Sequence, residues 1–374
     1  MRNLILKIPA LICAFAIAAA AAEESAEIVP VLELPEAEGG EMQILLPESD
    51  PMLGPREEYY LFREGEKSPY GYADPSITVN IGTGRIYKTN YMYARVRIAE
   101  PGQIRTMMCE SSLEKETTNM PDKLARRVKA VVAVNGVLEA DGTVKGPVIR
   151  QGVWLRPDGR ITGSKLEHWK KEPSIDTLVI DGRGDLRILE DENWDGVLRT
   201  LEDMGSDAVN VIAFGPALIV DGEPRYGYVN RQMSTHRVAQ RMAICQTGPL
   251  EYLLITSEGP ENPGSTGLLL DQFTELIATA FPEVKTAYNL DGGSSSALIF
   301  RKGSEFWAKI NCPRGGKKRP LRDIIYFADA WLPDEPEPAV EVPEEQEASE
   351  AEQNVSGSGQ APAENTAAPE KGTP

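Results

Sequence analysis

The sequence predicts an α+β (mixed α/β) fold, with multi-stranded mixed sheets flanked by a few helices in a single domain that has disordered acidic termini. Many short apolar segments alternate with turn signals, which is typical of strands. Fewer segments carry apolar residues at helical intervals. No linker-like break follows about Pro69, so one domain over residues 51–332 is favoured.

The N-terminus predicts export. Arg2 and Lys7 precede an apolar run, Leu11–Ala20, and small residues continue through Ala22 before acidic sequence begins. This pattern is typical of a signal peptide, here over residues 1–22. No later segment approaches the roughly 20 apolar residues of a membrane span. The mature chain is therefore expected to be secreted or otherwise extracytoplasmic, without stable membrane insertion.

Acidic residues are concentrated at the two ends. Residues 23–50 contain nine acidic and no basic residues, and residues 333–374 contain eleven acidic residues and one basic residue. Both segments are poor in aromatic residues, so they are predicted to be a disordered acidic segment and a disordered Pro/Glu/Ala-rich tail. Residues 51–332 are then nearly neutral, although the whole chain carries −18. A nucleic-acid partner is disfavoured because the basic surplus is missing.

Ten segments between the acidic ends are predicted to be strands, because each is short, apolar and bounded by turn residues. They are Tyr91–Ile98, Val128–Val134, Val148–Leu155, Thr177–Ile180, Val209–Val220, Met242–Ile244, Tyr252–Thr256, Thr286–Leu290, Ser296–Phe300 and Asp323–Trp331. Asp181-Gly182-Arg183-Gly184 and Asp221-Gly222 predict reversals between strands.

Three segments are predicted to be helical. After Ser265 and Thr266, which are good N-cap residues, apolar side chains recur at three- and four-residue intervals over residues 269–280. Pro121–Ala130 begins with proline near a first turn, and Trp194–Met204 stops at Gly205, as helices often do.

Cysteine and histidine offer little chemistry. Without the signal peptide the chain keeps Cys109, Cys245 and Cys312, an odd number that allows at most one internal disulfide. His168 and His236 are the only histidines, which makes a His-rich metal site or a Ser-His-Asp triad improbable. No cofactor and no metal are expected, although scattered carboxylates leave a hard cation possible.

The segment Thr286–Phe300 is the most informative. An apolar strand runs into Asp291-Gly292-Gly293-Ser294 before a second strand begins. Small residues let backbone N–H groups converge on an anionic oxygen where a bulky side chain would block approach. The alternative is a Gly-rich hairpin in which the aspartate is only a turn former.

Further segments follow one another in a distinctive order. They are Tyr93–Ile98, Gln103–Arg105, Ala133–Gly136, Val148–Gly152, Ala213–Gly222, Arg241–Ile244, Gly267–Leu270 and Asn289–Ser295, then Asn311 and Arg319. Together they resemble the phosphodiester glycosidase family, the N-acetylglucosamine-1-phosphodiester α-N-acetylglucosaminidase-like domains. The resemblance implies that residues 51–332 form such a domain. It also implies a secreted hydrolase that cleaves the glycosyl–phosphate bond of a sugar-1-phosphodiester in cell-envelope or extracellular glycans.

Two segments depart from the family pattern. Ala133–Glu139 lacks an aromatic pair, and Glu258-Gly259-Pro260 stands where family members commonly carry Asp-Gly-Arg. Either substrate contacts are remodelled or activity is reduced. A catalytically weakened glycan- or envelope-binding protein, and a phosphodiesterase that cleaves on the other side of phosphorus, therefore remain as alternatives.

Two carboxylates are the catalytic candidates. Asp291 ends a buried-looking strand and could act as a nucleophile or activate water, and Glu258 occupies the strand end at the departing motif. Arg241 could offer a planar guanidinium to phosphate, or could belong to a solvated basic stretch with Arg237.

The other candidates would bind substrate or phosphate. Asn135 could orient a sugar hydroxyl or a carboxylate, or form an Asn-Gly reversal with Gly136. Ser294 could donate a hydrogen bond to substrate. Gly215, Gly292 and Gly293 are expected to shape the pocket, and the resemblance adds Asn311 and Arg319, the latter also part of an ordinary charge run.

Overall fold

The computed structural model describes residues 28–43, 53–115, 117–138, 146–156, 176–190, 194–228, 235–302, 305–309 and 319–334. The chain divides into two units, Met1–Asp334 and Glu335–Pro374, and the second lies outside the described residues. The described part contains three α-helices and four sheets, which confirms the α+β class. Its strand pairings are all antiparallel, which refines the expectation of mixed sheets.

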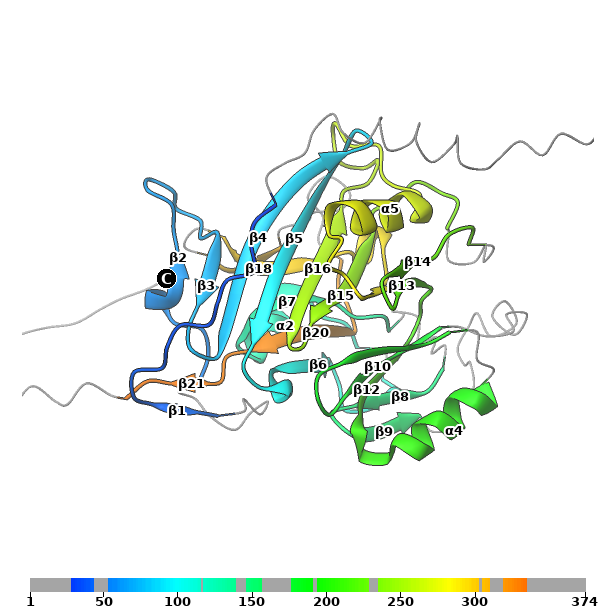
Figure 1. Ribbon diagram of the computed structural model, residues 1–374, viewed down its shortest axis with the longest axis horizontal. Helices are drawn as coiled ribbons and strands as arrows, with labels where there is room; N and C mark the ends of the chain where they lie inside the picture. The colour runs from blue at the N-terminus through cyan, green and yellow to red at the C-terminus, as the bar shows by residue number, and fades with distance from the viewer. Residues whose placement is uncertain are drawn as a thin grey trace, which may run out of the picture. The chain divides into compact units, whose positions relative to one another are not determined.

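The largest sheet has nine strands, in the order β14-β13-β17-β15-β16-β5-β4-β3-β2 (Figure 1). Its strands are β2 (Tyr60–Leu61), β3 (Gly71–Ala73), β4 (Ile77–Ile86), β5 (Thr89–Ile98), β13 (Ala217–Val220), β14 (Glu223–Pro224), β15 (Met242–Gly248), β16 (Glu251–Ser257) and β17 (Thr286–Asn289). Side chains alternate between two cores along these strands, so Tyr93 and Ile255 face one core while Val96 and Leu254 face the other.

Two five-stranded sheets and one two-stranded sheet complete the strands. One has the order β19-β18-β7-β20-β6 and another β11-β10-β12-β8-β9, and β1 pairs with β21. Their bounds are β1 (Glu41–Met42), β6 (Ile104–Met108), β7 (Ala130–Asn135), β8 (Val148–Arg150), β9 (Val153–Arg156), β10 (Thr177–Asp181), β11 (Leu186–Leu189), β12 (Ala208–Ala213), β18 (Leu298–Lys302), β19 (Glu305–Lys309), β20 (Asp323–Ala328) and β21 (Trp331–Leu332).

Three α-helices cover the sheets (Figure 1). They are α2 (Pro121–Arg127), α4 (Trp194–Met204) and α5 (Leu270–Ala280), and the short 3₁₀ helices are η2 (Glu57–Tyr59), η3 (Pro101–Gln103), η4 (Gly205–Asp207) and η6 (Gly293–Ser295). Each α-helix buries its apolar stripe in a separate core cluster with residues of the sheet beneath it. None of the described helices is both long and apolar enough to cross a membrane.

The predicted helix over 269–280 is confirmed, but its predicted N-cap is wrong. The cap is Leu269, whose N–H donates to Gln272 Oε1 at 3.0 Å. The Ser265 hydroxyl instead donates to Glu258, and the Thr266 hydroxyl donates to the Tyr87 carbonyl at 2.8 Å. The two hydroxyls that the sequence predicts to cap the helix therefore bond to residues elsewhere in the fold.

Two predicted strands are each divided. Val148–Leu155 is a hairpin, β8–β9, because Gln151 and Gly152 adopt φ of 51° and 77°. Val209–Val220 is two strands, β12 and β13, separated at a cis peptide bond between Gly215 and Pro216. The predicted reversals at Asp181–Gly184 and Asp221-Gly222 are confirmed by the pairs β10–β11 and β13–β14.

Strand β4 was not predicted, because glycines interrupt its apolar pattern. A Cβ added to Gly82 or to Gly84 would lie 2.2 Å from the ring of Tyr93 or of Tyr91, respectively. The two tyrosine rings therefore occupy the space that side chains would take on this strand. The absence of a side chain is what lets β4 pair with β5 here.

The prediction of disorder does not hold for residues 28–43. Residues 28–34, here called the N-terminal strap, lie along the nine-stranded sheet (Figure 1). The Val29 N–H donates to the Tyr93 hydroxyl at 2.9 Å, and the Thr78 hydroxyl donates to the Leu32 carbonyl at 2.9 Å. The N-terminal strap is therefore held in place by hydrogen bonds to the folded sheet. The composition of residues 23–50, which is acidic and poor in aromatic residues, by itself predicts disorder.

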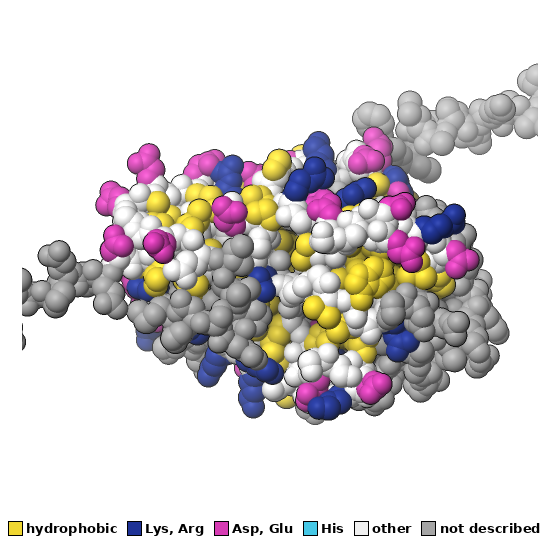
Figure 2. Space-filling model, turned by 90° about the horizontal axis from the view of Figure 1, so that it is seen from below, with side chains coloured by type: hydrophobic (Ala, Val, Ile, Leu, Met, Phe, Trp, Pro, Cys, Tyr) yellow, Lys and Arg dark blue, Asp and Glu magenta, His cyan; other side chains and the backbone are white. Residues whose placement is uncertain are grey.

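Acidic and basic side chains are interspersed over the described part of the face in Figure 2, with hydrophobic side chains exposed between them. Strand β9 contributes the exposed side chains of Val153 and Trp154 to the surface. This mixture fits the near neutrality expected of residues 51–332.

Two buried carboxyl groups meet where β3 approaches the end of β20. Asp74 and Asp329 are 0% and 1% exposed. The Ser76 hydroxyl lies 2.8 Å from Asp74 Oδ1 and 3.2 Å from Asp329 Oδ1, but its single hydrogen can serve only one of them. Burial and the charge of Asp74 raise the pKa of Asp329 to about 8, and burial also raises the pKa of Asp74. The pair therefore retains a proton at neutral pH.

This proton makes stability depend on pH. An unfolded aspartate has a pKa of about 3.9, so the folded protein holds the shared proton more tightly than the unfolded chain. The free energy of unfolding should therefore fall as pH rises from about 5 to about 8. Asp329→Asn, which imitates the protonated acid, should flatten this decline in urea titrations. Asp203→Asn, on the exposed face of α4, should not; an unchanged slope in Asp329→Asn would contradict the shared proton.

Candidate active site

The Asp291 loop continues the central strands of the nine-stranded sheet. The Leu290 N–H donates to the Met242 carbonyl at 2.9 Å, and the Gly293 N–H donates to the Gln240 carbonyl at 2.9 Å. The loop therefore follows the backbone just before β15. Asp291 itself is half-buried at the end of β17, as the sequence predicts.

Asn135 fixes the Asp291 loop from the second sheet. Its Nδ2 donates to the Asp291 carbonyl at 2.8 Å and to the Gly136 carbonyl at 3.0 Å, and its Oδ1 accepts from the Ala297 N–H at 3.0 Å. The side chain is fully buried. Asn135 thus connects the end of β7 to both ends of the loop, rather than forming a simple Asn-Gly reversal.

Gly136 is required by a buried ion pair beneath it. A Cβ added to Gly136 would lie 2.2 to 2.3 Å from the carboxyl atoms of Asp323. Asp323 Oδ1 accepts from the Leu138 N–H at 3.0 Å, and Oδ2 lies 3.2 Å from the Arg150 guanidinium. Burial lowers the pKa of Arg150, while the Asp323 charge opposes that shift. The pair therefore shapes the chain as it leaves β7.

Sequence reasoning did not select this pair as site residues. Arg150 lies inside the family-like segment Val148–Gly152, and Asp323 opens a predicted strand. The sequence did offer a signal for the pair, because Arg150 and Asp323 are charged residues that adjoin short apolar runs. Only the folded chain places the two charges together.

Arg241 lies in the interior beside the same loop. Its side chain is buried, its Nε donates to the Leu268 carbonyl at 3.0 Å, and its guanidinium donates to the Arg237 carbonyl at 2.6 Å. Burial lowers the pKa of Arg241 to about 10, so it remains charged at neutral pH. A Cβ added to Gly292 would lie 3.8 Å from the Arg241 Cα. Arg241 therefore does not belong to a solvated basic stretch.

Arg319 supplies a second cation. Its guanidinium donates to the hydroxyls of Ser294 at 3.1 Å and Ser295 at 3.0 Å, both within η6. It is half-buried, so it differs from an ordinary exposed charge run. A Cβ added to Gly293, where φ is +57°, would meet no atom within 4 Å in the described part. The loop is open on that side.

Three backbone N–H groups of the loop are used within the protein. The N–H groups of Gly293, Ser295 and Ser296 donate to the carbonyls of Gln240, Gly292 and Gly293, at 2.9, 3.1 and 3.3 Å. These donors are already used within the protein. The predicted anion cradle cannot draw on these three N–H groups, and the Arg319 guanidinium adds positive charge beside the loop.

Glu258 flanks the loop at the same edge of the sheet. Its carboxylate accepts from Asn90 Nδ2 at 2.9 Å and from the Ser265 hydroxyl. In the sheet, β15 lies between β16 and β17, so Glu258 follows a strand that is two spacings, about 10 Å, from β17. The structure thus places Glu258 near the Asp291 loop, with two donors already on its carboxylate.

Gly215 lies beside the strand that leads to Asp291. Its carbonyl accepts from Asn289 Nδ2 at 2.8 Å, and its φ is +71°. A side chain here would meet Asp176 at 3.2 Å. Gly215 therefore shapes the support of the loop. Asn311 lies outside the described residues.

The other sequence expectations concern metals and cysteines. Within the described ranges, no group of three or more His, Cys, Asp or Glu side chains is arranged to hold a metal ion. Cys109 is half-buried and Cys245 is buried, and both are free thiols. Burial raises the pKa of both thiols, which disfavours the reactive thiolate.

The described part is an antiparallel α+β domain in which the Asp291 loop is hydrogen-bonded to strands of two sheets. The family model for phosphodiester glycosidase matches residues 128–328, more than half of the chain. The chain therefore belongs to the phosphodiester glycosidase family. No curated protein matches the chain.

The solved structures that are similar to the chain include the two described next. One is the catalytic domain of zebrafish N-acetylglucosamine-1-phosphodiester α-N-acetylglucosaminidase, auto-inhibited by pro-peptide, with 16% identity, coverage of 68% of this chain and 84% of that one, and a TM-score of 0.49. The other is a hypothetical protein from Synechocystis, with 16% identity, coverage of 68% of this chain and 62% of that one, and a TM-score of 0.46.

Removal of the Asn135 amide should release the loop. Asn135→Ala leaves the Asp291 carbonyl and the Ala297 N–H without their partner, so the free energy of unfolding should fall by about 1–3 kcal/mol in urea titrations. Asn119→Ala, at an exposed asparagine, should change it by less than about 0.5 kcal/mol. Equal stability of the two variants would contradict the connection.

Proposed function

We propose that this protein hydrolyses the glycosyl–phosphate bond of a sugar-1-phosphodiester in cell-envelope or extracellular glycans. The observation that carries the proposal is the position of Arg319 over the Asp291 loop, within a chain of the phosphodiester glycosidase family. Arg241 adds a second, buried positive charge beside the loop.

The leaving group explains why such a site suffices. The group that leaves a sugar-1-phosphodiester is a phosphomonoester, a weak base, so its departure needs little protonation and depends mainly on charge stabilisation. Water adds to the anomeric carbon, directly or after an enzyme ester forms, and the bond from that carbon to the phosphate oxygen breaks. The electron pair stays on phosphate. The products are a reducing sugar and a phosphomonoester.

Each site residue has a proposed role. Asp291 acts on the anomeric carbon, either as nucleophile or as the base that takes a proton from water. Arg319 stabilises the phosphate charge, and the Ser294 hydroxyl, whose oxygen accepts from Arg319, donates its hydrogen to substrate. Asn135 positions Asp291, and Gly136, Gly215, Gly292 and Gly293 keep the chain close to the loop.

Glu258 is proposed as the second carboxylate. Its bonds to Asn90 and Ser265 hold it in one orientation at the edge of the site, where it could accept a substrate hydroxyl or assist proton transfer. The same bonds favour the second candidate function, a glycan-binding protein with weakened catalysis, because part of the carboxylate is already occupied. Export is also proposed, on the signal-peptide pattern of residues 1–22.

Product analysis distinguishes the candidate functions. The full chain is incubated with a panel of sugar-1-phosphodiesters, with and without chelator. Free reducing sugar with phosphomonoester supports the glycosidase. Sugar phosphate would indicate cleavage on the other side of phosphorus, and binding without turnover would indicate the glycan-binding alternative.

Asp291→Asn should abolish most hydrolysis. The variant keeps the shape of the side chain but removes its charge, so kcat should fall by about 10²–10⁴-fold with the thermal unfolding midpoint nearly unchanged. Asp203→Asn serves as the matched control, since it lies on the exposed face of α4. Full activity of a folded Asp291→Asn protein would exclude the proposed role.

Arg319→Ala should discriminate by charge. Loss of a charge-assisted contact predicts a fall of about 10–100-fold in kcat/KM for a sugar-1-phosphodiester. A neutral aryl glycoside of the same sugar should be affected much less. Arg199→Ala, at an exposed arginine, is the control. Equal losses for charged and neutral substrates would count against phosphate recognition.

A further inference from the structure

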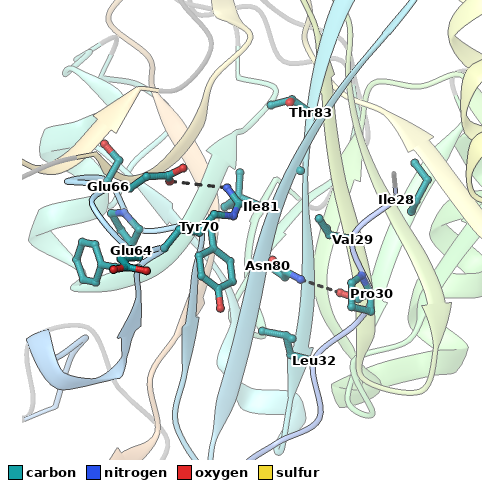
Figure 3. A pocket seen from close by; sticks show the side chains of 15 residues that line it. Ile28, Val29, Pro30, Leu32, Glu64, Glu66, Tyr70, Asn80, Ile81 and Thr83 are labelled. Carbon is teal, nitrogen blue, oxygen red and sulfur yellow. Dashed lines mark hydrogen bonds and ion pairs between the residues drawn. The ribbon is translucent and has the colours of Figure 1, made fainter. Parts of the chain in front are cut away.

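A groove of about 920 Å³ opens on the nine-stranded sheet (Figure 3). Its walls are the N-terminal strap, the middle of β4 and the connection between β2 and β3. Thr83 lines the groove, and it is paired across the sheet with Met92 of β5, then Thr256 of β16, then Met242 of β15. Three strand spacings, about 14 Å, therefore separate Thr83 from Met242. The groove is therefore separate from the Asp291 loop.

Asn80 gives this groove an unsatisfied acceptor. The side chain is 4% exposed, and its Nδ2 donates to the Pro30 carbonyl at 3.1 Å. That bond fixes the orientation of the amide, because a reversed amide would set two oxygens against each other. Its Oδ1 has no hydrogen-bond partner among the residues that the structure describes. The oxygen lies on the side turned away from Pro30, toward Tyr70 (Figure 3).

Aromatic side chains form the opposite wall. The Phe62 side chain is 42% exposed and lines the groove together with Tyr70. The Arg63 guanidinium lies 4.9 Å from the Tyr70 ring centroid, while the Tyr70 hydroxyl extends into the groove (Figure 3). Such rings pack against the C–H face of a sugar, and a tyrosine also offers a polar tip.

The charges restrict the ligand. Glu64 and Glu66 line the groove with one arginine, Arg63, which already lies 3.7 Å from Glu66. Excess negative charge disfavours phosphate and other anions. The buried Asn80 acceptor disfavours a purely apolar ligand, because its oxygen would then stay without a donor. A neutral ligand with many hydroxyl donors meets both conditions.

We propose that this groove binds a neutral oligosaccharide. Sugar hydroxyls donate to the Glu64 carboxylate and, after a small shift of the groove wall, to the buried Asn80 Oδ1, while a ring face packs on Phe62 and Tyr70. The strap completes the wall, which gives the acidic N-terminal segment a binding role. The groove goes beyond the hydrolase site and does not depend on its activity.

Calorimetric titration of the full chain with cellotetraose, maltotetraose and chitotetraose tests the groove. At least one of these neutral probes should bind saturably. Phe62→Ala and Tyr70→Phe should each weaken that association by about 5–10-fold, through loss of the stacking face or of the hydroxyl. Tyr226→Phe, which removes an exposed hydroxyl elsewhere, should leave it unchanged. Asp291→Asn should also leave it unchanged, so failure of the hydrolase and failure of the groove are distinguishable.

Three outcomes would overturn the proposal. The first is saturable binding to none of the three probes by the unaltered chain. The second is the same affinity in the two groove variants, each shown to be folded by its thermal unfolding midpoint. The third is displacement of the bound oligosaccharide by a simple sugar-1-phosphodiester or by oligolysine, which would assign the groove to another ligand.

Discussion

The side chain of Asn135 joins the two sheets on which the candidate site is built. Its amide meets the carbonyl of Asp291 and the N–H of Ala297, so both ends of the loop after β17 are held by the end of β7. A buried amide whose donors and acceptor are all used has one orientation. The direction of the Asp291 backbone is therefore set from outside its own sheet.

Two guanidinium groups near this loop differ in what surrounds them. Arg150 is buried against Asp323, so its charge is compensated and it stabilises the chain around Gly136. The described partners of Arg319 are two neutral hydroxyls, which leave its positive charge undiminished. A phosphodiester requires the second arrangement, since only an uncompensated cation attracts the anion. One residue type thus serves structure at one position and, in the proposed function, recognition at another.

The departing segment at Glu258 is integrated into the fold. A Cβ added to Gly259 would lie 2.5 Å from the Gln240 side chain and 2.9 Å from its backbone nitrogen, and Gln240 also donates to Asn262 at 2.9 Å. Gln240 in turn accepts from Gly293 in the Asp291 loop. The segment is therefore packed against the backbone that supports the candidate site.

Short-range pattern was enough to predict the α+β class, helix α4, the body of α5, and an aspartate loop at the end of a strand. Periodicity and turn residues are local properties, and the family resemblance rests on the same segments. Folding alone added the strap, strand β4, the Arg150–Asp323 pair and the roles of Ser265 and Thr266. The reason is separation along the chain: Asn135 meets Asp291 across 156 residues, and Arg150 meets Asp323 across 173. No local pattern encodes such a partner, because each of these residues also has a plausible local use.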